Sequence, residues 1–249
     1  MQYGICNLSI VPLRVEPSDA CELISQVLYG EIFKVLEQRK SWSKIRLAYD
    51  KYEGWIDNKQ YLEITEDEYK SIKIENHMLS NDLVEYIEDE NQQLSTIPLG
   101  ASLNGLSLLK HTFDGRTTST KHPKENLIKT AFMYLNAPYL WGGKTPFGID
   151  CSGFTQMVYK LNGYNLLRDA SQQATQGLAL SFIEESEPGD LAFFDNNEGL
   201  ITHVGIIMED NYIIHAHGKV RIDRLDHSGI YNIDKNIHTH KLRVIKKII

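Results

Sequence analysis

The stretch YLWGGKTPFGIDCSGFTQMVY, residues 139–159, decides the fold of the last part of the chain. It begins as a loop rich in Gly and Pro and continues into a segment whose apolar residues recur at helical spacing. These apolar residues are Phe154, Met157, Val158 and Leu161. Asp150 is a good candidate for the N-cap, which places Cys151 in the first turn of the predicted helix.

A thiol at this position has two possible roles. The positive end of the helix dipole and the unpaired backbone N–H groups of the first turn favour the thiolate, which is the form that attacks carbonyl carbons. Free cysteines are also among the residues most often buried as small apolar side chains. The stretch alone does not decide between a nucleophile and a packing residue.

Composition places the chain among ordinary soluble proteins. It has 249 residues, 42% hydrophobic and 24% charged, and a formal net charge of -7. The negative charge argues against nucleic acid as a partner, and no segment has the length and hydropathy of a membrane span. Three widely spaced cysteines make no disulfide framework, and the first fourteen residues lack the pattern of a signal peptide. We therefore expect a cytoplasmic protein with reduced thiols, or a periplasmic or secreted one if a leader has been removed.

The first part of the chain reads as short strands separated by turn residues. A strand is predicted over residues 9–15, a hairpin over 27–36, and an alternating strand over 42–47. A Gly-Glu turn, Trp-x-Lys-Ile and Gly-Trp-Ile follow one another in this region, and they resemble the motifs of bacterial SH3-like domains. The resemblance implies a small β-barrel over residues 1–64.

Residues 65–118 carry weaker signals. We expect a helix near Glu66–Lys73, strands at residues 83–87 and 96–99, and an extended course from Leu103 to Phe113. This region is predicted to be a degenerate second small β unit or a structured linker.

Residues 119–249 are predicted to form an α+β domain. A helix entered through Pro123 is expected over residues 122–135, and the helix of Cys151 follows. Strands are then predicted near residues 191–194, 203–208, 212–216 and 220–223, the middle two being antiparallel neighbours joined by a tight turn. Helices followed by an antiparallel sheet are typical of the α+β class.

Two histidines in these strands suggest a partner for the thiol. His203 begins one strand and His215 lies near the end of the next, so the hairpin can bring them side by side. A cysteine nucleophile needs a base, and the base works best when a third polar group orients its ring.

Five motifs occur in order: Tyr-x-Trp-Gly-Gly, Asp-Cys-Ser-Gly-Phe, Pro-Gly-Asp-Leu-x-Phe-Phe, His-Val-Gly-Ile and Ile-His-Ala. Over about residues 123–223 the chain resembles the NlpC-type cell-wall peptidases, which are papain-like cysteine peptidases. The resemblance implies that Cys151 is the nucleophile, His203 the base and His215 the orienting residue. It also implies that Tyr139 lies near the oxyanion, where its hydroxyl can assist the Cys151 N–H.

The remaining histidines suggest a metal site only weakly. His215 and His217 alternate on one strand, as do His238 and His240, but no His-Glu-x-x-His or paired-cysteine motif accompanies them. No metal and no cofactor is predicted, and four histidines are expected at the surface: His217, His227, His238 and His240.

The order of the domains narrows the expected substrate. An SH3-like barrel followed by an NlpC-type domain resembles the γ-D-glutamyl-L-diamino acid endopeptidases of the dipeptidyl-peptidase VI type. That resemblance implies hydrolysis of murein peptides, L-Ala-γ-D-Glu-diamino acid, that carry a free N-terminal L-Ala. A buried ammonium group needs carboxylate and hydroxyl partners. The candidates for these partners and for the pocket wall are Asp150, Ser152, Glu22, Tyr52, Asp169, Ser171 and Trp141.

Two other functions stay open. One is a secreted hydrolase that remodels peptidoglycan and uses the barrel to hold the wall. The other is an inactive module that binds wall peptides. The sequence gives neither the oligomeric state nor the choice between diaminopimelate and lysine in the substrate.

Overall fold

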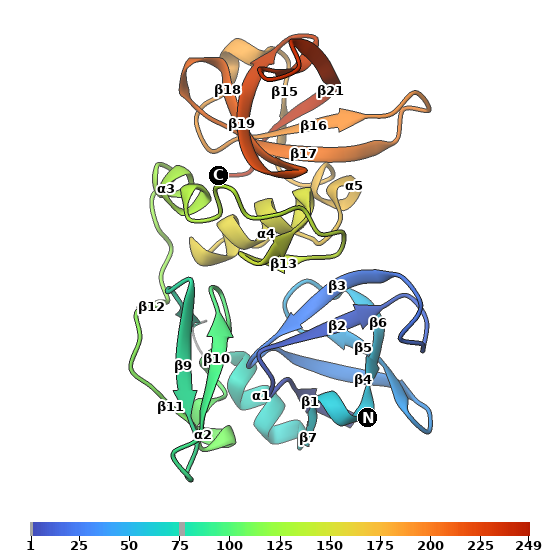
Figure 1. Ribbon diagram of the computed structural model, residues 1–249, viewed down its shortest axis with the longest axis vertical. Coiled ribbons are helices and arrows are strands. Elements are labelled where there is room, and N and C mark those ends of the chain that lie inside the picture. Colours follow the sequence, from blue (N-terminus) through green and yellow to red (C-terminus); the bar gives the residue numbers. More distant parts are fainter. Residues whose placement is uncertain (1, 75–77) are drawn as a thin grey trace. The chain divides into compact units, whose positions relative to one another are not determined.

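The structure is a computed structural model that describes residues 2–74 and 78–249 (Figure 1). The chain divides into two compact units. Unit 1 comprises residues 1–121 and 141–146, and unit 2 comprises residues 122–140 and 147–249. The short segment 141–146 therefore belongs to unit 1, although the sequence on both sides of it belongs to unit 2. Each unit is described by itself.

Unit 1 is built on a seven-stranded antiparallel sheet with the strand order β3-β2-β6-β5-β4-β1-β7. Its strands are β1 (Gln2–Ile5), β2 (Ile10–Arg14), β3 (Leu23–Leu28), β4 (Ile32–Gln38), β5 (Trp42–Leu47), β6 (Glu53–Asp57) and β7 (Leu62–Ile64). A short 3-10 helix, η1 (Asn58–Gln60), links the last two strands. The inward faces of these strands form one apolar core that includes Val11, Phe33 and Ile45.

Strand β5 shows how alternation fixes the inner face. Ser43, Ile45 and Leu47 are buried, and Arg46 points to solvent. The inward Ser43 is satisfied because its hydroxyl bonds to the Asn58 side chain at 2.7 Å and to the Tyr61 hydroxyl at 2.9 Å. The alternating strand predicted over residues 42–47 is thus confirmed. The hairpin predicted over residues 27–36 is wrong, because β3 pairs with β2 whereas β4 pairs with β1 and β5, so the strands on either side of Gly30 are not partners.

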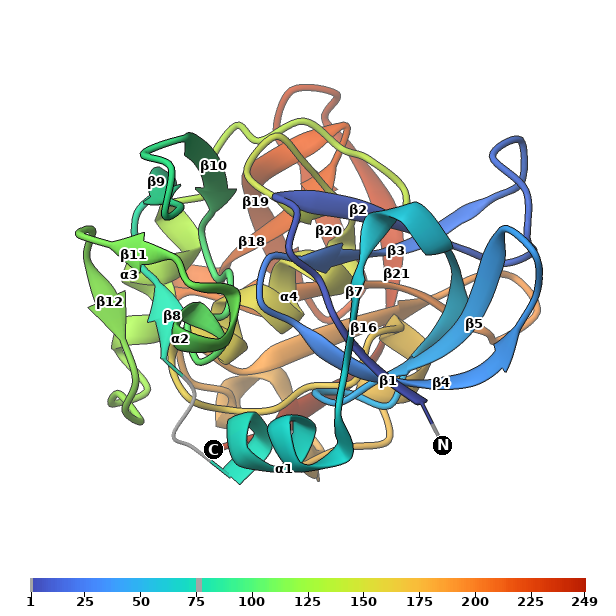
Figure 2. The same ribbon diagram turned by 90° about the horizontal axis from the view of Figure 1, so that it is seen from below.

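The segment after the barrel begins with helix α1 (Glu66–Ile74), which packs on β1 and β4 (Figure 2). Two small sheets follow, with the strand orders β10-β9-β11 and β12-β8. Their strands are β8 (Leu79–Ser80), β9 (Val84–Glu88), β10 (Leu94–Pro98), β11 (Thr112–Phe113) and β12 (Thr117–Thr118). Ile87, Ile97 and Leu103 pack with Tyr29 of the barrel in a second core. Residues 75–77, which the sequence analysis placed inside this region, lie outside the described residues.

This second core depends on a close approach at Gly30. Gly30 has φ +73, and a Cβ there would lie 1.9 Å from the Ser102 carbonyl oxygen. The Ser102 N–H in turn donates to the Tyr29 carbonyl at 2.8 Å. Only glycine gives both the left-handed backbone and the space for this contact.

The expectation of an extended course from Leu103 to Phe113 is wrong. Residues Leu106–Leu109 form the short helix α2, which Lys110 ends with a left-handed backbone, φ 56. The leucines at 103, 106 and 109 recur every three residues, which is helical spacing, and the neighbouring Gly105 obscured it in the sequence.

Unit 2 contains three helices against one antiparallel sheet (Figure 1). The helices are α3 (Asn126–Phe132), α4 (Cys151–Leu161) and α5 (Ala170–Gln173). The strand order is β15-β21-β16-β17-β18-β19-β20, and β20 also pairs with β21, so the sheet closes on itself. Its strands are β15 (Leu178–Leu180), β16 (Leu191–Asp195), β17 (Ile201–Ile207), β18 (Tyr212–His217), β19 (Lys219–Asp226), β20 (Gly229–Asn232) and β21 (Ile237–Lys247). The shorter elements are η2 (Ile183–Glu185), η3 (Glu209–Asn211), β13 (Lys144–Thr145, in unit 1) and β14 (Gly148–Ile149).

Helix α4 lies against β17 and β18, and α3 lies against α4. The four apolar residues expected on the inner face of α4 are buried, as predicted. Helix α3 is shorter than the predicted span 122–135, because residues 123–126 form a turn in which the Asn126 N–H donates to the Pro123 carbonyl at 3.0 Å. Among the described residues, no helix has the length and apolar character needed to cross a membrane.

Candidate active site

Cys151 is the first residue of α4, as the sequence predicts. Asp150 has an extended backbone and its Oδ1 accepts from the Gly153 N–H at 2.6 Å, so it is the N-cap. The thiol is almost fully buried, at 6% exposure. The cap fixes the helix start, and the helix packing on β17 brings the thiol to the sheet.

The ionisation of the thiol differs from the expectation drawn from the helix dipole. Burial raises the pKa of Cys151 to about 12, and the Asp150 carboxylate adds to this rise. Hydrogen bonds from the Val204 and Ser152 backbone and the charge of Arg168 act in the opposite direction but are outweighed. The group therefore rests as a neutral thiol, and a base must take its proton during attack.

His203 and His215 lie side by side, as the hairpin predicts. In the β17–β18 register Gly205 is paired with His215, so residues 203, 205, 215 and 217 lie on one face of the sheet. A Cβ on Gly205 would lie 2.9 Å from the His215 Cβ. The missing side chain at Gly205 allows the two rings to meet, with His203 Nε2 and His215 Nδ1 2.8 Å apart.

Asp223 of β19 continues this chain of hydrogen bonds. Its Oδ2 is 3.1 Å from His215 Nε2, and Arg221 donates to both of its carboxylate oxygens, at 2.7 and 2.8 Å. Burial opposes ionisation of Asp223, but hydrogen bonds from His215, Arg221 and the Ile233 backbone outweigh it and hold its pKa well below the usual range. Asp223 is therefore an ionised carboxylate that accepts hydrogen bonds and donates none.

The carboxylate determines which ring nitrogens carry protons. Because Asp223 only accepts, the proton between it and His215 must lie on Nε2 of His215. Nδ1 of the neutral His215 ring is then an acceptor, and the bond between the two rings must be donated by Nε2 of His203. The lone pair of His203 consequently lies on Nδ1, which is the nitrogen left to receive a proton.

His203 itself is held uncharged. Burial lowers its pKa well below the usual value, and the neighbouring rings of His215, His240 and His217 lower it further. A neutral imidazole with a free lone pair is the form that accepts a proton from a thiol.

Two histidines expected at the surface instead adjoin His203. The His240 ring stacks on the His203 ring with centroids 4.2 Å apart and 27° between planes, and His217 meets His240 edge-on at 4.8 Å. The expectation fails because closure of the sheet through β20 and β21 carries His240 back to the start of β17. His227 and His238 are exposed, as expected.

Tyr139, His217 and His240 line a pocket beside His203 with a volume of about 390 Å³; the other lining residues are Thr202, Ala216 and Gly218. Tyr139 is anchored through its N–H, which donates to the Gly218 carbonyl at 3.0 Å. Burial raises the pKa of its hydroxyl, and the nearby Cys151 and Asp150 raise it further, so the hydroxyl remains a proton donor.

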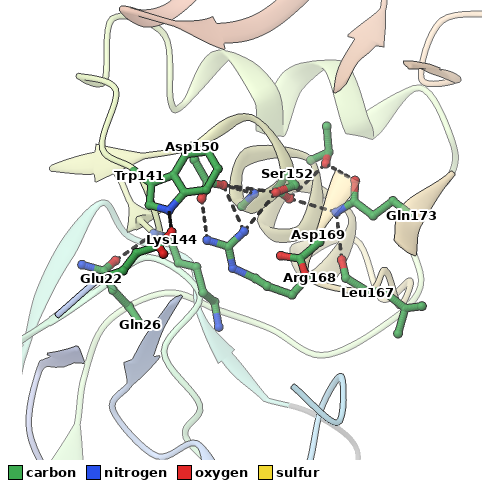
Figure 3. Close-up of polar contacts among 12 residues, drawn as sticks. Glu22, Gln26, Trp141, Lys144, Asp150, Ser152, Leu167, Arg168, Asp169 and Gln173 are labelled. Carbon is green, nitrogen blue, oxygen red and sulfur yellow. Dashed lines mark hydrogen bonds and ion pairs between the residues drawn. The ribbon is translucent and has the colours of Figure 1, made fainter. Parts of the chain in front are cut away.

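The Asp150 carboxylate does more than cap the helix (Figure 3). Arg168, 1% exposed, donates to Oδ1 and Oδ2 of Asp150 at 3.0 and 2.7 Å and to the Ser152 hydroxyl at 3.0 Å. Gln173 completes the group by donating to the Ser152 carbonyl at 2.9 Å. This buried cluster ties α4 to the segment that precedes α5.

The remaining predicted substrate-binding residues lie in different places. Asp169 is at the start of α5, where its N–H donates to the Gln172 side chain at 3.2 Å, and Ser171 is exposed on that helix. In unit 1, Glu22 accepts from the Trp141 indole N–H at 2.7 Å (Figure 3). Tyr52 packs half-buried against the barrel core. Trp141 itself is 59% exposed.

Sequence reasoning assigned no site role to Asp223 or Arg221. The sequence feature that could have identified them is Lys-Val-Arg-Ile-Asp-Arg-Leu-Asp at residues 219–226. Its alternation of apolar and polar residues is that of a strand, and Asp223 lies at a buried position of that strand. Such a residue requires charged or hydrogen-bonding partners, and the position of His215 on the next strand supplies one.

A metal was not predicted. Among the described residues, no group of three or more His, Cys, Asp or Glu side chains is arranged to hold a metal ion.

A thiol at a helix entrance, packed on a sheet that carries a base and its orienting residue, defines a papain-like cysteine peptidase. Residues 136–239 match the NlpC/P60 family, and residues 13–60 match the bacterial dipeptidyl-peptidase SH3 domain. The chain belongs to the NlpC/P60 family and is a cysteine peptidase with an N-terminal SH3-like domain.

Several known proteins are similar to most of the chain. The chain is 30% identical over 217 residues to a γ-D-glutamyl-L-lysine dipeptidyl-peptidase of Bacillus subtilis, covering 77% of this chain and 71% of that one. It is 27% identical to dipeptidyl-peptidase 6 of Lysinibacillus sphaericus, covering 86% of this chain and 88% of that one. An NlpC/P60 family protein from Bacillus cereus has the same fold, with a TM-score of 0.81, 21% identity and 99% of each chain covered.

Proposed function

We propose that the chain hydrolyses the bond between γ-D-glutamate and the diamino acid in murein peptides that carry a free N-terminal L-Ala. The name of the Bacillus subtilis relative, a γ-D-glutamyl-L-lysine dipeptidyl-peptidase, supports this substrate class. The proposed reaction, acyl transfer to a cysteine, is supported by the chain of hydrogen bonds from Asp223 through His215 to His203. This chain leaves a neutral base on the strand next to α4.

In the proposed first step, Nδ1 of His203 takes the proton of the Cys151 thiol as sulfur attacks the γ-carbonyl carbon. The C=O bond opens to an oxyanion, which the Tyr139 hydroxyl and the Cys151 N–H stabilise. His215 holds the ring, and the Asp223 carboxylate stabilises the positive charge that develops on the imidazole pair.

In the next steps the C–N bond breaks, and His203 returns its proton to the leaving amine of the diamino acid. The γ-glutamyl group then remains on sulfur as a thioester. His203 takes a proton from water, the hydroxide attacks the thioester carbonyl, and the thiolate leaves and recovers the proton. The products are L-Ala-D-Glu and the diamino acid.

Selectivity for a free amine requires carboxylate and hydroxyl groups that would be left unpaired by an acylated substrate. The candidates in unit 2 are Asp150, Ser152, Asp169 and Ser171. In the structure the Asp150 carboxylate already forms an ion pair with Arg168, so it attracts a substrate ammonium group less strongly. Glu22, which the Trp141 indole orients, is the stronger carboxylate candidate, together with the Tyr52 hydroxyl.

A soluble recycling enzyme of the cytoplasm fits the net charge of -7, since an anionic wall repels such a chain. In this proposal the barrel contributes to substrate selection and binds neither intact wall, nucleic acid nor membrane.

The test compares synthetic L-Ala-γ-D-Glu-diaminopimelate with its N-acetylated form, with release of the diamino acid measured by mass spectrometry. Cleavage of the free-amine peptide alone supports the proposal. Equal cleavage of both favours a wall-remodelling hydrolase, and cleavage of neither favours a binding module. Cys151→Ala should abolish all turnover, whereas the matched control Cys21→Ala, which alters the half-buried thiol of unit 1, should retain it.

A further inference from the structure

The pocket beside His203 contains two histidines that the mechanism above does not use, His217 and His240. The pocket is also lined by His203 and Tyr139 but not by Cys151. It therefore adjoins the base.

The chemistry of acyl transfer tells which part of the substrate occupies that side. The acyl carbon must contact the sulfur, whereas the leaving nitrogen must receive its proton from His203. The residue attached to that nitrogen therefore extends past the base, which this pocket adjoins.

The pocket presents polar groups that are available to a ligand. Within the described part of the chain, neither ring nitrogen of His217 has a hydrogen-bond partner, and His240 uses Nδ1 for the Thr239 hydroxyl at 2.9 Å. Nε2 of His240 is therefore the ring nitrogen that can bond to a ligand. The Thr202 side chain adds a hydroxyl group to the same wall.

The charges around these rings favour an anion. The pKa of His217 is lowered by burial and then by the nearby cations Lys235 and Arg221, while Asp223 has the opposite and smaller effect. Arg221 is paired with Asp223 at 2.7 Å and with Asp234 at 2.8 Å, so Lys235 is the cation of this group that remains to attract an anion. Neutral imidazoles can donate to an anion or accept from a cation, and the charge of Lys235 makes the anion the better ligand.

We propose that His217 and His240 form a subsite for a carboxylate of the leaving diamino acid. This inference rests on the proposed function and names the group of the substrate that the leaving side recognises. Lysine offers one such group, its α-carboxylate, and diaminopimelate offers a second at the end of its side chain.

Three peptides distinguish these sources: L-Ala-γ-D-Glu-L-Lys with a free carboxylate, its C-terminal amide, and the diaminopimelate peptide amidated at the α-carboxylate alone. The wild type should cleave the lysine acid about 10- to 100-fold better in kcat/KM than the lysine amide, since a charge-assisted hydrogen bond is lost. Retained cleavage of the amidated diaminopimelate peptide would assign the subsite to the side-chain carboxylate, and its loss would assign it to the α-carboxylate.

His217→Phe keeps a flat ring and removes the hydrogen bonds. We expect it to reduce the acid-to-amide ratio towards 1, mainly through KM, while the exposed control His227→Phe leaves the ratio as in the wild type. As an independent readout, free L-lysine should inhibit the wild type more strongly than cadaverine, which lacks the carboxylate.

The inference is overturned if the wild type cleaves the lysine acid, the lysine amide and the amidated diaminopimelate peptide equally well, or if His217→Phe lowers kcat/KM equally for all three. Those outcomes leave the proposed function intact, because the wild type still cleaves murein peptides. Absence of cleavage of every free-amine peptide would instead overturn the proposed function and this inference with it.

Discussion

Replacing Arg168 with Met should destabilise unit 2 strongly, because the guanidinium is the buried partner of Asp150. The two side chains are 1% and 8% exposed and are joined at 2.7 Å. Removing one member of a buried ion pair leaves an uncompensated charge and costs about 3–5 kcal/mol. Three hydrogen bonds are lost at once, two to Asp150 and one to Ser152, which supports the upper half of that range.

The assay must report unit 2 specifically. All three tryptophans, Trp42, Trp55 and Trp141, lie in unit 1, so indole fluorescence follows the wrong unit. Native-state hydrogen exchange of the α4 amides gives the free energy of opening where the ion pair acts. Tryptophan fluorescence during urea unfolding then serves as the control for unit 1.

A double variant separates the ion pair from simple loss of packing. Asp150→Asn with Arg168→Met removes both charges, and an Asn side chain still caps the helix. We expect the double variant to lose less stability than the sum of the two single variants by at least about 1 kcal/mol. A loss below about 1 kcal/mol for Arg168→Met alone, or strict additivity, would refute the buried-pair reasoning.

Three further predictions concern the site. Asp223→Asn should lower kcat by about 10²- to 10⁴-fold with little change in KM, because an amide can donate to His215 and select the wrong ring tautomer. Asp226→Asn is the surface control, and equal kinetics of the two variants would contradict the tautomer argument. The rate of iodoacetamide alkylation of Cys151, measured by mass spectrometry with Cys21 replaced by Ser, should rise steadily from pH 6 to 9; a plateau near neutrality would indicate a preformed thiolate instead. Burial lowers the pKa of His240 to about 4, below its unfolded value of about 6.5, so the unfolded state binds more protons and the free energy of unfolding should fall from pH 7 to 5. His240→Gln should flatten this pH dependence, measured by urea unfolding followed by circular dichroism. An unchanged pH dependence in the variant would contradict the role of His240.

The parts of the site that the sequence could predict are those fixed by local geometry. Asp150 caps a helix three residues ahead of the N–H that it accepts, so the cap and the position of Cys151 follow from the neighbouring residues alone. His203 and His215 lie in two strands joined by a short turn, and such a hairpin needs no knowledge of the remaining chain.

The parts that were missed depend on contacts between distant segments. His240 reaches His203 only because β21 pairs with both β16 and β20 and closes the sheet. The pairing of Arg168 with Asp150 depends on how the chain returns between α4 and α5. The ionisation of Cys151 was predicted from the helix dipole, but burial in the folded unit outweighs that dipole. That residues 65–118 form a degenerate second small β unit or a structured linker stays a prediction.

The segment at residues 141–146 has a consequence for how such chains can be cut and recombined. Its Lys144 is completely buried, with the ammonium group bonded to Glu31 at 3.3 Å and the backbone N–H to Gln26 at 2.7 Å. A fragment starting at residue 122 would keep this lysine but lose both of its partners. The loop a few residues before the nucleophile would then expose polar and apolar groups that are buried in the full chain. If the barrel is exchanged for that of another protein, residues 141–146 therefore have to be exchanged with it. The barrel and this hexapeptide are expected to be compatible only when both come from the same protein.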